Sequence, residues 1–185
     1  GASAVKLQIF QRDFLLSKYH NMYDEFGEIE IKKKDWMSLL DKVGRLASDV
    51  IVEVFDESSL ELSEASGVVK AYKIPTSNIG DKDFMRLVAE TNKTIYLGVG
   101  GATMLEINSA VKYLKKIVKG KLILMHGIQS FPTKLEDSQI SLISYLINKH
   151  QLDVGYADHI SADEKELSVI LPAMAVAAGA TVIEK

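Results

Sequence analysis

Seven short apolar runs alternate with stretches of helical periodicity along this chain of 185 residues, and this alternation restricts the possible folds more than any other feature. Strands buried on both faces show such near-continuous Val, Ile and Leu runs, and they belong to parallel sheets covered by helices. The pattern therefore predicts a parallel α/β sheet, with one strand fewer than the eight of a closed barrel. The runs are Ala4–Ile9, Val50–Phe55, Val68–Ile74, Thr94–Val99, Lys121–His126, Leu152–Tyr156 and Ala180–Glu184.

The segments between the runs carry helix signals. Asp35 precedes a stripe of apolar residues and is expected to cap a helix there. Thr103 occupies the same position before another stripe, and Glu106 follows it at capping-box spacing. Further helices are predicted over Ser138–Ile147 and Ala162–Ala178.

Composition predicts one globular domain and excludes several classes of partner. The chain is 47% hydrophobic, which allows a sizeable core, and its formal net charge is −3. With no excess of Lys and Arg to neutralise phosphates, we expect neither nucleic acid nor an anionic membrane as a partner. The sequence contains no cysteine and shows neither a signal peptide nor an apolar run of membrane-spanning length, so the expected location is cytoplasmic.

The last two apolar runs end in residues that can carry chemistry. Asp153–His159 and Ala180–Lys185 finish in acids, a histidine and a lysine, and the C-terminal ends of parallel strands are where barrel enzymes place such groups. The two stretches resemble the last two barrel strands of the sialic acid synthase family, with patterns G-Y/L-S-D-H and G-A-x-V-I-E-K/R-H. The chain stops one residue before the final histidine of that pattern.

Further motifs resemble the same family in the same order along nearly the whole chain. They are Gly1–Gln8 (family G-A-D-A-V-K-F-Q), Val54–Ser58 (T-P-F-D-E-E-S), Ala71–Ser77 (A-F/Y-K-I-A/P-S), Leu97–Ala102 (L-S-T-G-M-A) and Leu124–Thr133 (L-L-H-C-x-S/N-x-Y-P-T). Each is weak alone, but their shared order and spacing are specific. The resemblance implies a TIM (β/α)8-type barrel present as strands two to eight, with residues 1–185 a single partial domain cut from a longer protein.

The resemblance also implies a reaction. Members of the family condense phosphoenolpyruvate with an N-acetylated amino sugar, forming a sialic acid or related nonulosonic acid and releasing phosphate. They are carbon–carbon bond-forming transferases that use a divalent ion, Mn²⁺ or Mg²⁺, as a Lewis acid and template. For the full-length protein, the resemblance further implies a homodimer.

Lysines at two strand ends are the expected phosphoenolpyruvate ligands. Lys6 and Lys73 each follow an apolar run, and both match phosphate-binding positions of the family, although a lysine at a strand end often only reaches solvent. Thr76 keeps a hydroxyl where the family has serine. The positions that match or replace sugar contacts of the family are Gln8, Asn78, Gln129 and Phe131.

His159 is the expected metal ligand and, with Glu184, a catalytic residue. A lone histidine is more often structural, but His159 matches one of two metal histidines of the family, and Glu184 matches its active-site glutamate. The second histidine is expected directly after Lys185. His126 and Asp158 are expected to line the pocket.

Three departures from the family pattern weaken the catalytic interpretation. Glu53, Gly98 and Ala157 stand where the family has Thr, Ser and Ser, so three hydroxyl donors around the phosphate are missing. A carboxylate within about 4 Å of a phosphate costs several kcal/mol at a protein dielectric of about 20, unless a cation intervenes. The alternative is therefore a degenerate, non-catalytic barrel that binds a ligand or supports oligomerisation.

Overall fold

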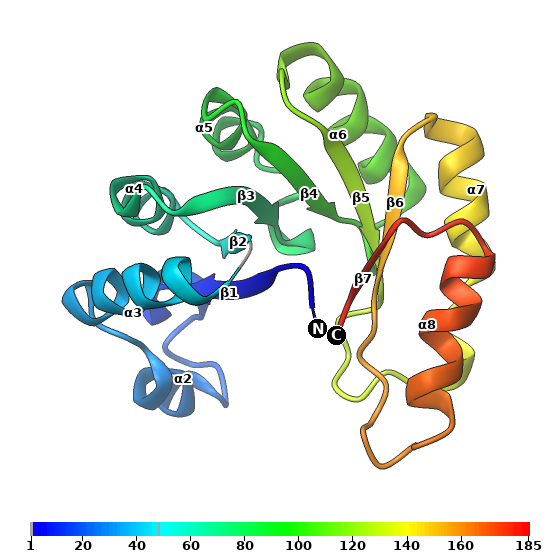
Figure 1. Ribbon diagram of the computed structural model, residues 1–185, viewed down its shortest axis with the longest axis horizontal. Helices are drawn as coiled ribbons and strands as arrows, with labels where there is room; N and C mark the ends of the chain where they lie inside the picture. Colours follow the sequence, from blue (N-terminus) through cyan, green and yellow to red (C-terminus); the bar gives the residue numbers. More distant parts are fainter. Residues whose placement is uncertain (1, 48) are drawn as a thin grey trace.

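The computed structural model describes residues 2–47 and 49–185, so Gly1 of the first matched motif lies outside the described residues. Strands and helices alternate along these residues, as the apolar runs predict (Figure 1). The strands are β1 Val5–Ile9, β2 Val50–Val54, β3 Val69–Ile74, β4 Thr94–Gly98, β5 Leu122–His126, β6 Asp153–Ala157 and β7 Val182–Glu184. The helices are α1 Arg12–Leu15, α2 Tyr23–Ile29, α3 Lys33–Leu46, α4 Glu57–Ser66, α5 Lys82–Glu90, α6 Met104–Ile117, α7 Ser141–His150 and α8 Leu167–Ala177, with 3-10 turns η1 Thr76–Asn78 and η2 Leu135–Asp137.

The seven strands form one parallel sheet in sequential order, β1 to β7. The sheet curls so that helices α3 to α8 lie on its outer side and the two ends of the chain approach each other (Figure 1). Side chains confirm the approach, because Lys6 of β1 and Glu184 of β7 lie 3.0 Å apart. The predicted parallel α/β architecture is confirmed, as an open and strongly curled sheet.

The core has two layers because successive strand residues point to opposite faces. One set of side chains packs under the helices and includes Val52, Tyr72, Leu97 and Leu124. A smaller set fills the inside of the curl: Ile123, Met125, Ala157, Tyr96 and Val182. The same alternation places Lys6, Glu53, Lys73 and Glu184 on the inner face. Glu53, Lys73 and Glu184 lie near the C-terminal ends of their strands, whereas Lys6 lies near the start of β1 and does not follow it as predicted.

The helix starts agree only partly with the sequence signals. The capping box of Thr103 and Glu106 forms at the start of α6, as predicted. The expected Asp35 cap is wrong, since α3 begins earlier and Asp35 lies in its first turn, where a carboxylate favours the helix dipole instead. The last two predicted helices, α7 and α8, begin at Ser141 and Leu167, later than expected.

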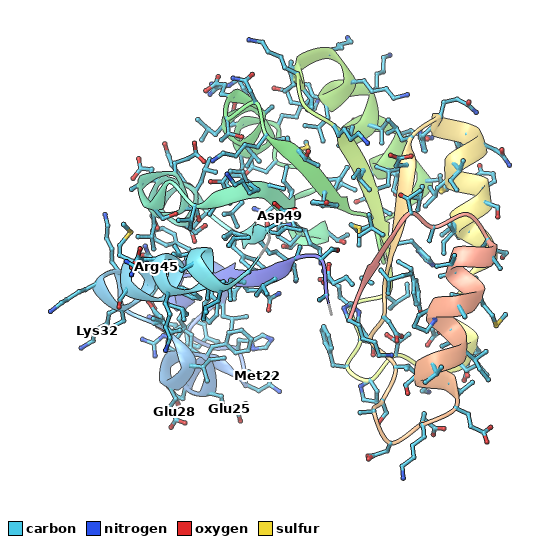
Figure 2. The ribbon with its side chains drawn as sticks, in the orientation of Figure 1. Met22, Glu25, Glu28, Lys32, Arg45 and Asp49 are labelled. Carbon is cyan, nitrogen blue, oxygen red and sulfur yellow. The ribbon has the colours of Figure 1, made fainter. Side chains whose placement is uncertain are left out.

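The outer surface near the chain start is charged. Figure 2 shows Glu25 and Glu28 of α2, Lys32 before α3 and Arg45 near its end pointing away from the sheet, and all four are exposed. None of the helices in the described ranges has the length and apolar character needed to cross a bilayer.

Candidate active site

A cavity of about 560 Å³ opens at the C-terminal end of the sheet. It collects residues from strands far apart in the sequence, which is how parallel barrels build their sites. Nine residues singled out from the sequence line it: Lys6, Gln8, Glu53, Lys73, Gln129, Phe131, Asp158, His159 and Glu184. The structure thus brings most of the candidate residues together at one mouth.

Four charged side chains form a cluster on the floor of this cavity. Lys6 Nζ contacts Glu53 and lies 3.0 Å from Glu184 Oε1, while Lys73 Nζ lies 2.9 Å from Glu184 Oε1 and 3.4 Å from Glu53 Oε1. Lys73 is 3% exposed and Glu53 1%. We call Lys6, Glu53, Lys73 and Glu184 the buried charge cluster, and its formal charges cancel.

Strand register explains why these residues meet. Gln8 is the register partner of Glu53, and Glu53 is the register partner of Lys73, so three polar side chains stand side by side on neighbouring strands. Adjacent strands lie about 4.8 Å apart, within reach of these side chains. Glu184 arrives from β7 only because the sheet curls.

The cluster shifts the acidity of its members. Burial alone would raise the pKa of Glu184, but the ammonium groups of Lys73 and Lys6 outweigh it and hold the pKa of this carboxyl below its usual value. Burial alone would lower the pKa of Lys6, yet the carboxylates of Glu53 and Glu184 raise it above its usual value. Both groups are therefore charged at neutral pH.

The negative charge of Glu53 is compensated within the cavity by the ammonium groups of Lys6 and Lys73. Besides the two lysines, the Gln8 side-chain amide donates a hydrogen bond to Glu53 Oε2 at 2.9 Å. The cations that the sequence argument required are therefore present. The sequence analysis missed this pairing. The signal that could have found it is that polar residues on both neighbouring strands, Gln8 and Lys73, stand beside Glu53 on the inner face.

His159 is oriented by the backbone of the loop after β5. Its Nδ1 lies 2.8 Å from the carbonyl oxygen of Ile128, so Nδ1 carries the hydrogen and Nε2 is left as an acceptor. The Phe131 ring lies against the imidazole, with centroids 4.5 Å apart. A backbone carbonyl that fixes the tautomer in this way is a usual partner of metal-binding histidines.

Asp158 is paired with the last residue of the chain. Lys185 Nζ lies 2.6 Å from Asp158 Oδ2 and also donates to the carbonyl of Ser168. The described ranges hold no group of three or more His, Asp or Glu side chains arranged to bind a metal. Of these two residues, His159 could hold a metal ion through Nε2, whereas Asp158 is paired with Lys185.

An apolar wall faces the charged floor. It is formed mainly by the segment between β1 and α3, whose two short helices were not predicted from the sequence. Gln8 and Gln129 stand with Phe131 around the cavity between floor and wall. The wall residues are Phe10, Leu15, Leu16, Phe26, Ile29 and Phe55.

Three candidate residues lie outside the cavity. His126 is corrected most clearly, because it neighbours the inward Met125 on β5 and must face outward, where its Nε2 lies 3.0 Å from the carbonyl oxygen of Ser138. Burial lowers the pKa of this imidazole. Thr76 is half-buried at the start of η1, and its buried hydroxyl has no hydrogen-bond partner in the described residues. This oxygen lies 3.0 Å from where a Cβ on Gly98 would stand.

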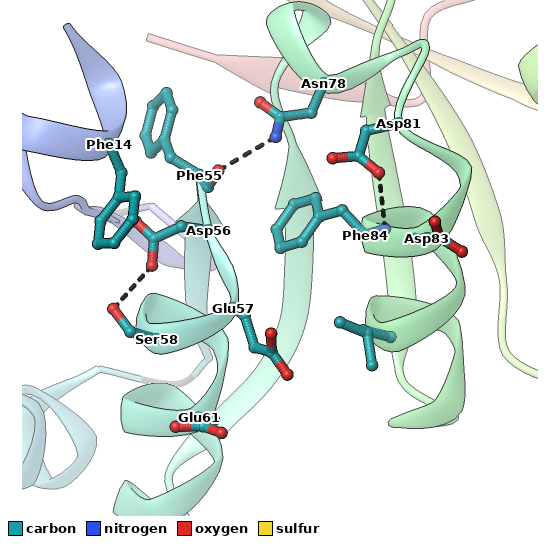
Figure 3. Close-up of a pocket in the computed structure, with 11 residues that line it drawn as sticks. Phe14, Phe55, Asp56, Glu57, Ser58, Glu61, Asn78, Asp81, Asp83 and Phe84 are labelled. Atoms are coloured by element: carbon teal, nitrogen blue, oxygen red, sulfur yellow. Dashed lines mark hydrogen bonds between the residues drawn. The ribbon is translucent and has the colours of Figure 1, made fainter.

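Asn78 lines a neighbouring cavity of about 670 Å³. Figure 3 shows its amide turned to the carbonyl oxygen of Phe55, a hydrogen bond of 3.1 Å. The same view shows Asp56 and Asp81 at the starts of α4 and α5, where each accepts a hydrogen bond within its own helix start. Asn78 is thus separated from the other expected sugar contacts by Phe55, which lines both cavities.

Several known synthases are similar to this chain in sequence or in fold. The N,N'-diacetyllegionaminic acid synthase of Legionella pneumophila is 27% identical over 203 residues, covering 100% of this chain and 55% of the enzyme. The pseudaminic acid synthase of Campylobacter jejuni strain 81-176 is 34% identical over 115 residues, covering 62% of the chain and 32% of the enzyme. The chain spans about half the length of the Legionella relative.

The crystal structure of an N-acetylneuraminic acid (sialic acid) synthetase from Leptospira borgpetersenii, in complex with citrate, superposes with a TM-score of 0.88 at 28% identity. The match covers 100% of this chain and 62% of that one. The family model described as NeuB matches residues 1–185. With the curled parallel sheet and the mouth residues in place, the whole-length match shows that this chain belongs to the NeuB family.

Proposed function

We propose that this chain supplies most of the active site of a cytoplasmic nonulosonic acid synthase, which condenses phosphoenolpyruvate with an N-acetylated amino sugar and releases phosphate. The observation that carries the proposal is the convergence of Lys6, Lys73, His159 and Glu184 at one cavity, from β1, β3, β7 and the segment after β6. The names of the relatives support a condensing synthase over a degenerate barrel.

Each side chain has a task that its position allows. Lys6 and Lys73 bind the phosphate and carboxylate of phosphoenolpyruvate, as point charges at the floor of a partly enclosed cavity. Glu184, held ionised by both lysines, handles the proton at the forming hydroxyl. Gln8 and Gln129 orient the sugar, and the apolar wall keeps water from the reacting atoms.

A divalent ion, Mn²⁺ or Mg²⁺, would polarise the sugar aldehyde when bound. His159 would hold it through Nε2, since Nδ1 is committed to the Ile128 carbonyl. The remaining ligands would come from the histidine expected after Lys185, from substrate and from water.

We also propose that the seven strands are strands two to eight of a (β/α)8 barrel in a longer, homodimeric protein. The support is that β1 and β7 are the two edges of the curled sheet and lie near each other. A further parallel strand between them would pair both edges and close the barrel.

The test is phosphate release by the full-length protein. Phosphoenolpyruvate should lose phosphate only when an N-acetylated amino sugar and Mn²⁺ or Mg²⁺ are both present, with the condensed acid identified by mass spectrometry. Lys73→Gln should abolish release, whereas the matched control Lys70→Gln, an exposed lysine on the same strand, should not. Absence of release with a broad panel of aldoses would reject the synthase in favour of a binding barrel.

A further inference from the structure

Glu53 is a buried acid placed between the two cations of the proposed substrate site. It is 1% exposed on β2, with Lys6 and Gln8 reaching it from β1 and Lys73 from β3. Glu184 faces the same ammonium groups from β7. No other titratable side chain in the described ranges is paired with Glu53.

The lysines have few donors to spare. An ammonium group has three N–H donors. Lys6 contacts Glu53 and Glu184, and Lys73 contacts Glu53 and both carboxylate oxygens of Glu184. A multiply charged anion that reaches these lysines meets a cluster of zero net charge and has to replace a carboxylate as their acceptor.

We infer that Glu53 makes anion binding at Lys6 and Lys73 a proton-coupled step, in which the Glu53 carboxylate takes up one proton as the anion takes its place on the ammonium groups. The protonated carboxyl then offers an O–H donor to the anion, where the resembled family has a threonine hydroxyl. The inference rests on the proposed function, because the anion is the phosphoenolpyruvate of that proposal.

The geometry selects Glu53 over Glu184 as the proton acceptor. Glu53 is the less solvated of the two, with its side chain 1% exposed against 19% for Glu184, and burial favours the neutral form of a carboxyl. The ammonium contacts do not separate the two acids, because Lys73 lies closer to Glu184 whereas Lys6 lies closer to Glu53. When an anion replaces it on the ammonium groups, the Glu53 carboxylate therefore has less water to solvate its charge than the Glu184 carboxylate has.

The experiment is titration calorimetry of full-length protein with phosphoenolpyruvate and, separately, with sulfate, in buffers of different ionisation enthalpy. We expect about one proton taken up per anion bound, and a Kd that rises about tenfold per pH unit above neutrality. Phosphate monoesters ionise with a pKa near 6, below this range, and sulfate does not titrate in it, so the proton belongs to the protein.

Variants assign the proton. Glu53→Gln should remove the uptake and tighten binding at pH 8 by about tenfold or more. Glu53→Thr should act in the same direction and serves if the glutamine variant is unstable. Glu61→Gln, at an exposed position, should behave as the wild type.

Each other result overturns the inference in a recognisable way. Tight binding without proton uptake, or an uptake that persists in both Glu53 variants, refutes the role of Glu53 and leaves the proposed synthase intact. Failure of wild type and both variants to bind phosphoenolpyruvate at any pH refutes the lysine pair as its site, and the proposed function with it.

Discussion

Removing Lys73 should destabilise the fold well beyond an ordinary surface change. Lys73→Met keeps most of the side-chain volume but leaves two carboxylates sharing Lys6, with Glu53 1% exposed. Breaking a buried ion pair typically costs about 3–5 kcal/mol, and we take the lower end, about 3 kcal/mol, because Lys6 still contacts both acids. For a chain of this size that corresponds to a melting temperature lower by about 6–12 °C.

The assay is urea unfolding followed by circular dichroism, at neutral pH, with Lys70→Met as the control from the same strand. Lys70 is exposed, so its variant should stay within about 0.5 kcal/mol of the wild type. The double variant Lys73→Met/Glu53→Gln removes one charge of each sign and should recover about 1–2 kcal/mol relative to Lys73→Met. The reasoning is refuted if Lys73→Met and Lys70→Met have the same free energy of unfolding, or if the double variant is no more stable than Lys73→Met. The ion pairs of the buried charge cluster would then not contribute the stability assigned to them.

Other predictions follow from the acidity of buried groups, from packing and from the proposed metal ligand. Because the pKa of Glu184 is lowered in the fold, its contribution is present above the unfolded pKa of about 4.3 and is lost as pH falls through the folded value; Glu184→Gln should flatten this acid limb in urea titrations. The pKa of His126 is also lowered, so stability should decline as pH falls below about 6.5, and His126→Gln should remove that decline. Gly100→Ala should cost about 1–3 kcal/mol, since the added Cβ would meet the carbonyl of Gly127, and normal unfolding of this variant would contradict the close approach. His159→Ala should weaken Mn²⁺ binding to the full-length protein by about tenfold or more in calorimetry, and unchanged affinity would exclude His159 as a ligand.

The strands, and most of the residues that line the cavity, were predictable because both depend on local patterns in the sequence. All seven apolar runs became strands, and Lys73 and Glu184 follow from the rule that parallel strands deliver chemistry at their C-terminal ends. Lys6 lies near the start of β1, so the rule does not explain its place in the cavity. His126 also lies at the C-terminal end of its strand, but its side chain points to the other face of the sheet. Two adjacent strand residues cannot both face inward, and Met125 already does. Applying the alternation from Met125 would have placed it correctly.

The apolar wall and the charge pairing could not be predicted in the same way. Residues 12–29 form two short helices whose apolar side chains show no long period, and they turn toward the cavity only through tertiary packing. The contact of Glu184 with Lys6 depends on how far the sheet curls, which no local pattern specifies. Register alone would have paired Glu53 with Lys73.

The ion pair between Lys6 and Glu184 joins the first and last strands of a sheet in which those strands share no backbone ladder among the described residues. Among the described residues the two edges of the sheet are thus linked by side-chain charge, whereas backbone hydrogen bonds link each pair of neighbouring strands. A ligand held by Lys6 would therefore lie where the two edges of the sheet meet, in contact with residues from the first and the last strand.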